Sequence, residues 1–276
     1  MRKERLCLGT NDGYGLSVLD QIRLFKQVGF DAFFTRYDAH IKEYARFAER
    51  HGMAYQSVHA SIKNADKLWG SAKIAQTVID DWETCINDCA DAGVPMVIIH
   101  AFRGIDKLGT PTINGVKNFN KIVELAKKRN VKIAVENCEG ESYLKTLLDA
   151  FPDNETVGFC WDTGHEFCYG NTTSAIDGLG SRLIATHLND NIGVTSADGK
   201  ISSADDLHLL PFDGKIDWKS IAKRLVRFGY DDILTFELKK TARYADMSAE
   251  DFARECFKRA SLFLDELKTI KIMERS

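Results

Sequence analysis

Proline and long apolar runs are both scarce in this sequence. Only four of the 276 residues are proline and twenty are glycine, which excludes collagen-like, proline-rich and compositionally disordered chains. No apolar run approaches the ~20 residues that cross a bilayer. No apolar stretch follows the charged start MRKERLCLGTND, as one would in a secretory signal. We therefore expect a cytoplasmic protein with no membrane partner.

An excess of positive charge is also absent. The 37 Lys and Arg residues are outnumbered by 40 Asp and Glu residues, so the formal net charge is −3. This composition does not favour a protein that grips nucleic acid through a broad basic surface. The seven cysteines follow no C-x-x-C or framework spacing, which is typical of reduced, mostly buried thiols. The sequence also lacks G-x-S-x-G, G-x-G-x-x-G and Walker spacings.

What is present is a regular alternation of two hydrophobic patterns. Short, nearly continuous apolar runs predict strands at residues 4–9, 31–35, 54–59, 95–101, 131–136, 156–161, 183–187 and 232–238. Helical periodicity between them predicts helices near 17–28, 39–51, 72–92, 114–129, 142–151, 173–180, 217–229 and 248–270. Strands that are apolar throughout are expected in a parallel sheet buried on both faces. The sequence therefore predicts an α/β protein with a single (β/α)8 TIM barrel domain over residues 1–276, and an open doubly wound sheet is the alternative.

Metal-capable residues stand at the ends of six successive predicted strands. In chain order they are His59, His100, Glu136, Asp162, His187 and Glu237. The carboxyl ends of TIM barrel strands converge on one face, where barrel enzymes place their chemistry, so these side chains should meet there. One such residue alone is most simply a hydrogen-bonded loop residue. Six in succession indicate a functional site.

Four of these residues come from consecutive strands and can surround one ion. Glu136, Asp162, His187 and Glu237 offer three carboxylates and one imidazole, a set that suits Mn²⁺, Mg²⁺, Co²⁺ or Zn²⁺ and leans away from a structural zinc. Burying these carboxylates without a cation would be costly, because like charges at close range resist joint ionisation. We predict one divalent metal ion, with Mn²⁺ as the first choice.

Several residues next to this set are candidates for supporting roles. His165 and His208 follow the sixth and seventh strands. Asn137, Asn189 and Asp190 flank predicted ligands. Side chains in such positions often orient a metal ligand, although ordinary loop residues would occupy the same places. The residue types alone leave both readings open.

The motifs around these residues resemble the xylose-isomerase-like TIM barrel superfamily. The matching segments are VEN (135–137), DTGH (162–165), HLND (187–190), D-x-H (206–208) followed by P-x-D-G-x-I-D-W (211–218), and FEL (236–238). This superfamily contains sugar and sugar-phosphate isomerases and epimerases together with endonuclease IV. The resemblance implies a metal-dependent isomerase or epimerase that moves a proton next to a carbonyl through an enediolate.

The resemblance also implies roles for individual residues. Glu136, Asp162, His187 and Glu237 match the shared metal site. In ketose 3-epimerases of this group, residues like Glu136 and Glu237 also exchange the substrate proton, and one like His165 contacts sugar oxygens. We therefore predict catalytic roles for Glu136, Glu237 and His165, and substrate binding by His59, His100, His165 and His208. Gly193 and Ser142 stand where the epimerase pattern has Arg and Glu, so the identity of the sugar stays open.

The alternative is an abasic-site DNA endonuclease like endonuclease IV, with three zinc ions. Its ligand set finds a candidate at every position: His59, His100, Glu136, Asp162, His165, His187, Asp206, His208 and Glu237. The net charge of −3 and the P-F-D-G-K-I-D-W segment favour the carbohydrate branch. We expect a small carbohydrate as partner and no nucleic acid, and leave a homo-oligomer open.

Overall fold

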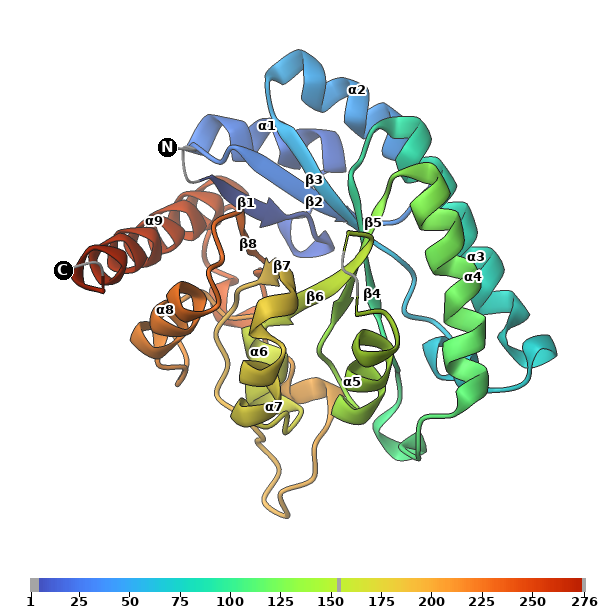
Figure 1. Ribbon diagram of the computed structural model, residues 1–276. Helices are drawn as coiled ribbons and strands as arrows, with labels where there is room; N and C mark the ends of the chain where they lie inside the picture. Colours follow the sequence, from blue (N-terminus) through green and yellow to red (C-terminus); the bar gives the residue numbers. More distant parts are fainter. Residues whose placement is uncertain (1–4, 153–154, 275–276) are drawn as a thin grey trace.

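Eight parallel strands form the centre of the structure, a computed structural model that describes residues 5–152 and 155–274 (Figure 1). The strands are β1 (Leu6–Gly9), β2 (Ala32–Arg36), β3 (Ala54–His59), β4 (Met96–His100), β5 (Lys132–Glu136), β6 (Val157–Asp162), β7 (Leu183–His187) and β8 (Leu234–Phe236). Each falls within one residue of a predicted strand range. The predicted strand at 4–9 begins at residue 4, which lies outside the described residues.

The strands close almost completely into a barrel. Their order is β7-β6-β5-β4-β3-β2-β1-β8, and an isolated parallel bridge between Leu188 and Phe236 brings the two ends of this order together. Across that junction, the N–H of Leu188 donates to the carbonyl of Thr235 at 2.8 Å. The TIM barrel is therefore confirmed, and the alternative of an open doubly wound sheet is wrong.

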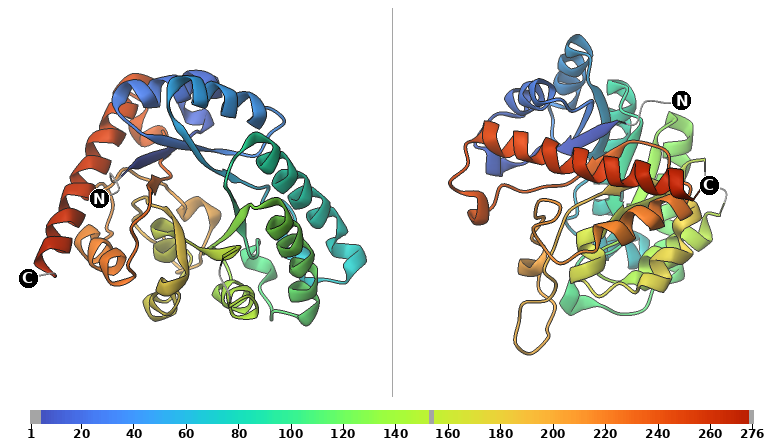
Figure 2. Two further views of the ribbon diagram at one scale, coloured as in Figure 1. Left: turned by 45° about the horizontal axis from the view of Figure 1, so that its top comes forward. Right: turned by 90° about the vertical axis from the view of Figure 1, so that its left-hand side faces the viewer.

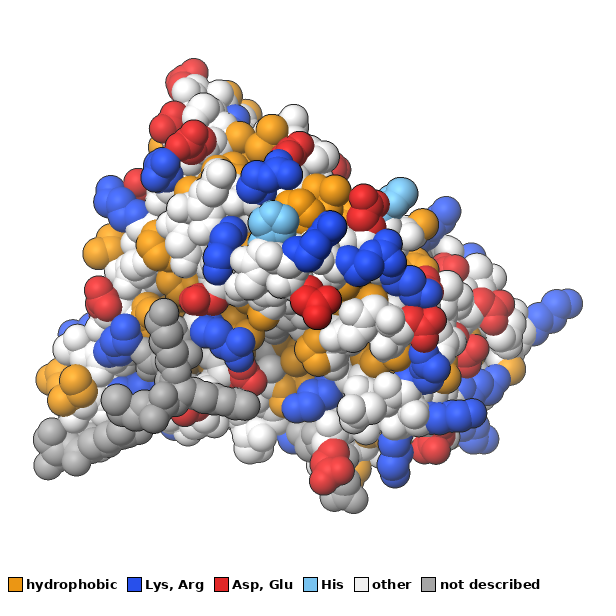
Figure 3. All heavy atoms as spheres, turned by 90° about the horizontal axis from the view of Figure 1, so that it is seen from above, with side chains coloured by type: hydrophobic (Ala, Val, Ile, Leu, Met, Phe, Trp, Pro, Cys, Tyr) orange, Lys and Arg blue, Asp and Glu red, His pale blue; other side chains and the backbone are white. Residues whose placement is uncertain are grey.

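Helices surround the strands as an outer layer (Figures 1 and 2). They are α1 (Val18–Val28), α2 (Ile41–His51), α3 (Ala72–Ala92), α4 (Ile113–Arg129), α5 (Glu141–Ala150), α6 (Thr163–Cys168), α7 (Thr173–Gly178), α8 (Trp218–Arg227) and α9 (Ala249–Met273). All but α6 correspond to predicted helices. None of the helices in the described ranges is long and apolar enough to cross a membrane. The surface over α1 and α2, seen from above in Figure 3, mixes basic and acidic side chains.

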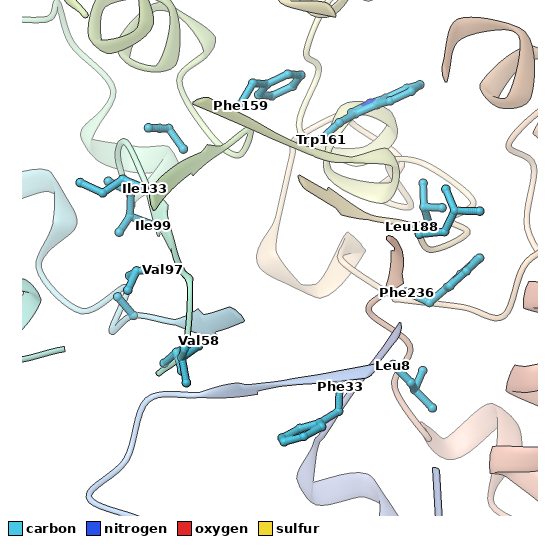
Figure 4. Packing of buried hydrophobic residues seen from close by; sticks show 14 of the residues in the cluster. Leu8, Phe33, Val58, Val97, Ile99, Ile133, Phe159, Trp161, Leu188 and Phe236 are labelled. Carbon is cyan, nitrogen blue, oxygen red and sulfur yellow. The ribbon is translucent and has the colours of Figure 1, made fainter. Parts of the chain in front are cut away.

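Successive side chains along each strand point alternately into the hydrophobic core and into the interior of the barrel, where the site lies. Val97, Ile99, Ile133 and Phe159 belong to the large apolar cluster between the strands and the helices (Figure 4). The intervening residues Ile98, Ala134, Cys160 and Ala185 form a separate cluster, because successive side chains of a strand point to opposite faces. The predicted site residues continue this second series two residues further on, at His100, Glu136, Asp162 and His187. The strand period therefore directs them into the mouth of the barrel.

Candidate metal centre and active site

The four predicted ligands form one compact group. Glu136, Asp162, His187 and Glu237 each offer an atom, and these atoms lie within 4.8 Å of one another. Nδ1 of His187 lies 3.0 Å from Oε1 of Glu136 and 3.1 Å from Oε2 of Glu237. These separations match donors that share a cation at about 2.0–2.2 Å, which stand about 3.0–3.5 Å apart.

The hydrogen-bonding capacity of His187 supports the same reading. Its Nδ1 carries at most one hydrogen, yet it faces carboxylate oxygens of both Glu136 and Glu237 at hydrogen-bond distance. A proton there satisfies one oxygen well, whereas a divalent cation satisfies both. The donor set thus fits a metal ion, and a metal would be held by Glu136, Asp162, His187 and Glu237.

The charges in this group shift the pKa of each member. Burial alone would lower the pKa of His187, but the charges of Glu136 and Glu237 outweigh it and raise the pKa to about 10. Burial opposes the ionisation of Glu136 and Glu237, yet the neighbouring histidines hold the pKa of both carboxyls well below the usual range. Burial raises the pKa of Asp162 to about 6, because His165 compensates it only in part. With three carboxylates and one imidazole, the group has more potential negative charge than its single histidine can neutralise.

Two asparagines hold Asp162 in place. Nδ2 of Asn189 donates to both carboxylate oxygens of Asp162, at 3.0 and 2.9 Å. Oδ1 of Asn137 accepts from the backbone N–H of Asp162 at 2.7 Å, and its Nδ2 donates to the Asp162 carbonyl at 2.8 Å. Gly164 is required beside them, because a Cβ there would lie 1.9 Å from Oδ1 of Asn189. Asn137 and Asn189 therefore take the supporting positions considered from the sequence.

Within the described residues, the side chain of Asp190 forms no hydrogen bond to a predicted ligand but has a structural role in the following loop. Its oxygens accept hydrogen bonds from Nε1 of Trp218 at 2.8 Å and from the backbone N–H of Ile216 at 3.1 Å. It thereby fixes the segment 211–218 that leads into α8. The side chain next to the ligands serves the fold of the following loop.

The other four candidate histidines lie in two further groups beside the first. Nε2 of His59 and Nε2 of His100 lie 3.1 and 3.2 Å from Oε2 of Glu136. Asp206 lies between two imidazoles, 2.9 Å from Nε2 of His208 and 3.5 Å from Nε2 of His165. Each of these two groups also places three potential ligand atoms within 4.8 Å of one another. All nine residues of the endonuclease-like set are thus brought together.

A family model described as a xylose isomerase-like TIM barrel matches residues 22–260. The chain belongs to this family. The match spans the region from α1 to α9, including every residue of the three groups. The prediction that residues 1–276 form one such domain stays a prediction for the remaining ends.

Two proteins are similar to this chain in sequence. The protein y4fM of Sinorhizobium fredii is 31% identical over 231 residues, covering 72% of this chain and 71% of that protein. MJ1311 of Methanocaldococcus jannaschii is 28% identical over 199 residues, covering 66% of this chain and 64% of that protein.

The solved structures are alike in fold. A zinc-bound IolI protein has a TM-score of 0.78 at 16% identity, covering 95% of this chain and 99% of its own. L-ribulose 3-epimerase has a TM-score of 0.78 at 14% identity, with 99% of both chains covered. The 3-keto-D-glucoside 4-epimerase YcjR of E. coli has 0.71 at 13%, with 95% and 100% covered. At these identities the likeness shows the fold alone.

A cavity of about 650 Å³ opens above the three groups of this family member. Glu237 and the histidines His59, His100, His165 and His208 line it. Glu136 does not line it, because His59 and His100 cover its Oε2 and the residue is fully buried. The two carboxylates predicted to act as a catalytic pair therefore differ, and only Glu237 reaches the cavity directly.

The cavity also holds basic residues that the sequence reasoning missed. Arg36, Lys63, Arg103, Lys107 and Lys239 all line it. None of them belongs to a recognisable motif or spacing, and the net charge of −3 conceals their local positive charge. The one available signal was their position at or after the ends of strands β2, β3, β4 and β8.

Proposed function

We propose that this protein is a divalent-metal-dependent isomerase or epimerase of sugars or sugar phosphates. The observation that carries the proposal is the four-residue ligand group at the floor of a cavity lined by Glu237 and four histidines. Family membership adds support, and several structural neighbours are named as sugar epimerases. A bound metal would supply electrostatic stabilisation of the oxyanion formed as a proton leaves the carbon next to a carbonyl.

The side chains divide the proton chemistry between them. Glu237 faces the cavity and is held ionised, so it is the base that takes the substrate proton. Oε2 of Glu136 lies 3.1 Å from Nε2 of His59 and 3.2 Å from Nε2 of His100, and these imidazoles separate it from the cavity. Glu136 therefore exchanges a proton with the opposite face of the substrate through one of these imidazoles. His165, which Asp206 and the carbonyl of Asn137 hold in place, orients a substrate oxygen.

Deuterium exchange tests this function directly. A panel of ketoses and ketose phosphates is incubated in D₂O with Mn²⁺-loaded protein, and uptake is followed by NMR and mass spectrometry. We expect uptake at one carbon, and a loss of about 10²–10⁴-fold in rate for Glu237→Gln. Glu124→Gln, an exposed carboxylate on α4, is the matched control and keeps the rate. No exchange with any sugar in metal-loaded protein would contradict the proposal.

The three adjoining groups favour endonuclease-like chemistry as the second candidate. Three zinc ions would find ligands at all nine residues. The number of metal ions per chain, measured after saturation with Zn²⁺, separates the candidates together with nicking of abasic DNA. We expect one tight ion and intact DNA. Three ions with nicked DNA would replace the sugar assignment.

A further inference from the structure

We propose that the substrate of this cavity carries a negatively charged group, a carboxylate or a phosphate monoester, that binds Arg36, Lys63 and Arg103. This inference rests on the proposed function, because it names the class of substrate for the same site. It concerns the part of the cavity formed by the ends of β2, β3 and β4, whereas the four-residue ligand group comes from β5 to β8.

Three consecutive strand ends supply the three cations. Arg36 is the last residue of β2, Lys63 lies in the loop after β3, and Arg103 lies in the loop after β4. Neighbouring strands of the barrel are paired β2 with β3 and β3 with β4. The three side chains therefore reach the same cavity from adjacent positions on its wall.

Two of these cations have no protein partner. The side chains of Arg36 and Lys63 make neither a hydrogen bond nor an ion pair within residues 5–152 and 155–274. The other two lysines at the cavity are engaged, Lys107 with Asp66 at 3.0 Å and Lys239 with Asp206 at 3.7 Å. The uncompensated positive charge is thus confined to one side.

Arg103 is held in place by an ion pair with Glu139. Its Nε lies 3.7 Å from Oε1 of Glu139, a buried carboxylate with 4% exposure. A buried carboxylate is costly without a cation, so Glu139 and Arg103 stabilise each other. This contact occupies the Nε side of the guanidinium, and the terminal nitrogens make no hydrogen bond in the described part of the chain.

An anionic substrate accounts for all three observations. Guanidinium groups bind carboxylate and phosphate through paired hydrogen bonds, and an ammonium adds a point charge. Cations that line one cavity create a positive potential there, which attracts an anionic ligand. A neutral sugar needs only hydrogen bonds and would make no use of this potential. The charged group would also fix which end of the substrate faces Glu237.

Ligand binding without turnover tests the proposal. The probes are a neutral ketose, its phosphate ester, the matching sugar acid and inorganic phosphate, measured by calorimetry on Mn²⁺-loaded protein at two salt concentrations. The test variants are Arg36→Gln and Lys63→Gln, because neither side chain has a partner among the residues that the structure describes. Arg50→Gln on α2 and Lys73→Gln on α3, both exposed, are the matched controls.

We expect an anionic sugar to bind more tightly than the neutral ketose, and each test variant to weaken its binding about 10- to 100-fold. The control variants should leave binding unchanged. The phosphate ester and the sugar acid distinguish the two sources of charge. Equal binding of neutral and anionic sugars, or anion binding that ignores both variants, would overturn the proposal.

The outcomes also separate this proposal from the proposed function. Deuterium exchange on a neutral ketose, unaffected by Arg36→Gln and Lys63→Gln, would leave an isomerase and refute the anionic substrate. Anion binding that depends on both residues, with no exchange on any sugar, would support the charge site and contradict the isomerase. An abasic oligonucleotide that binds through these residues while small anions do not would overturn the small-molecule proposal.

Discussion

The two halves of the barrel mouth differ in how their charged side chains are stabilised. In the acidic half, formed by the ends of β5 to β8, Glu136, Asp162 and His187 are buried and Glu237 is partly buried, and hydrogen bonds and ion pairs link them to one another and to their neighbours. The basic half, Arg36, Lys63 and Arg103 from β2 to β4, is more exposed, and two of its three side chains have no partner in the described residues. Buried charges need partners, whereas exposed ones remain hydrated. The acidic half is therefore organised before any ligand arrives, and the basic half remains available for one.

Removing ligands from the acidic half should have the largest effect. The double variant Asp162→Asn/His187→Ala removes two donors that lie within 4.8 Å of both glutamates. We expect loss of bound metal and a fall in activity of at least about 10²–10⁴-fold. Elemental analysis of protein purified without chelator measures the metal. Unchanged metal content would refute the ligand assignment, and Arg36→Gln should keep its metal.

Loosening a supporting residue should have a smaller effect on the same half. Asn189→Leu removes both hydrogen bonds to the Asp162 carboxylate. We expect metal affinity to fall about 10- to 100-fold, as measured by competition with a metal-binding dye. A fall in thermal stability with no change in affinity would show that Asn189 serves only the fold.

The acidic half should also make metal binding depend on pH. His187 must lose its proton to act as a ligand, and its pKa stands at about 10 in the metal-free group. Binding at pH 7 should therefore release a proton, and affinity should rise about tenfold per pH unit up to that value. Calorimetry in buffers of different ionisation enthalpy counts the protons released. A pH-independent affinity between pH 7 and 9 would contradict this assignment.

The same pKa predicts how the metal-free protein responds to pH. A histidine with a raised folded pKa stabilises fully below its unfolded value near 6.5, and this contribution is lost as pH rises through about 10. Thermal unfolding of metal-free protein should shift to lower temperature over that range. Metal-loaded protein, in which His187 binds the ion instead of a proton, should lack this dependence.

The smallest effect should come from a residue that borders the acidic half without joining it. Asp190→Ala leaves Nε1 of buried Trp218 without its acceptor. We expect a loss of about 1–3 kcal/mol in the free energy of unfolding, with metal affinity close to wild type. Chemical denaturation and metal titration measure the two quantities. A large loss of metal would instead place Asp190 among the residues that orient the ligands.

The strand ends were predictable because each strand appears in the sequence as an apolar run and several of these runs end at a metal-capable residue. Apolar runs marked each strand, and His100, Glu136 and His187 each close one. The sequence did not predict the six-residue helix α6, which follows β6 with no residue between them. Its N-cap is Asp162, whose Oδ1 accepts from the N–H of His165 at 2.7 Å. Strand β8 was also predicted too long, since only Leu234–Phe236 pair with β1.

Depth within the site was less accessible to sequence reasoning. Glu136 and Glu237 look equivalent as strand-end carboxylates, yet His59 and His100 cover only the first. Their difference depends on contacts between β3, β4 and β5, which no local pattern encodes. The basic half was missed for a similar reason, because isolated basic residues acquire meaning only when the barrel brings them to one cavity.

The junction between β7 and β8 gives the metal site a mechanical consequence. These strands stand at the two ends of the strand order and meet through a single bridge. His187 and Glu237 lie on either side of that junction, with Nδ1 and Oε2 3.1 Å apart. An ion held by both residues would cross-link β7 and β8 at this junction. It would thereby reduce the conformational freedom of the state in which the two strands separate. Metal binding would then stabilise the packing of β8, and of α9 that follows it, against the rest of the barrel.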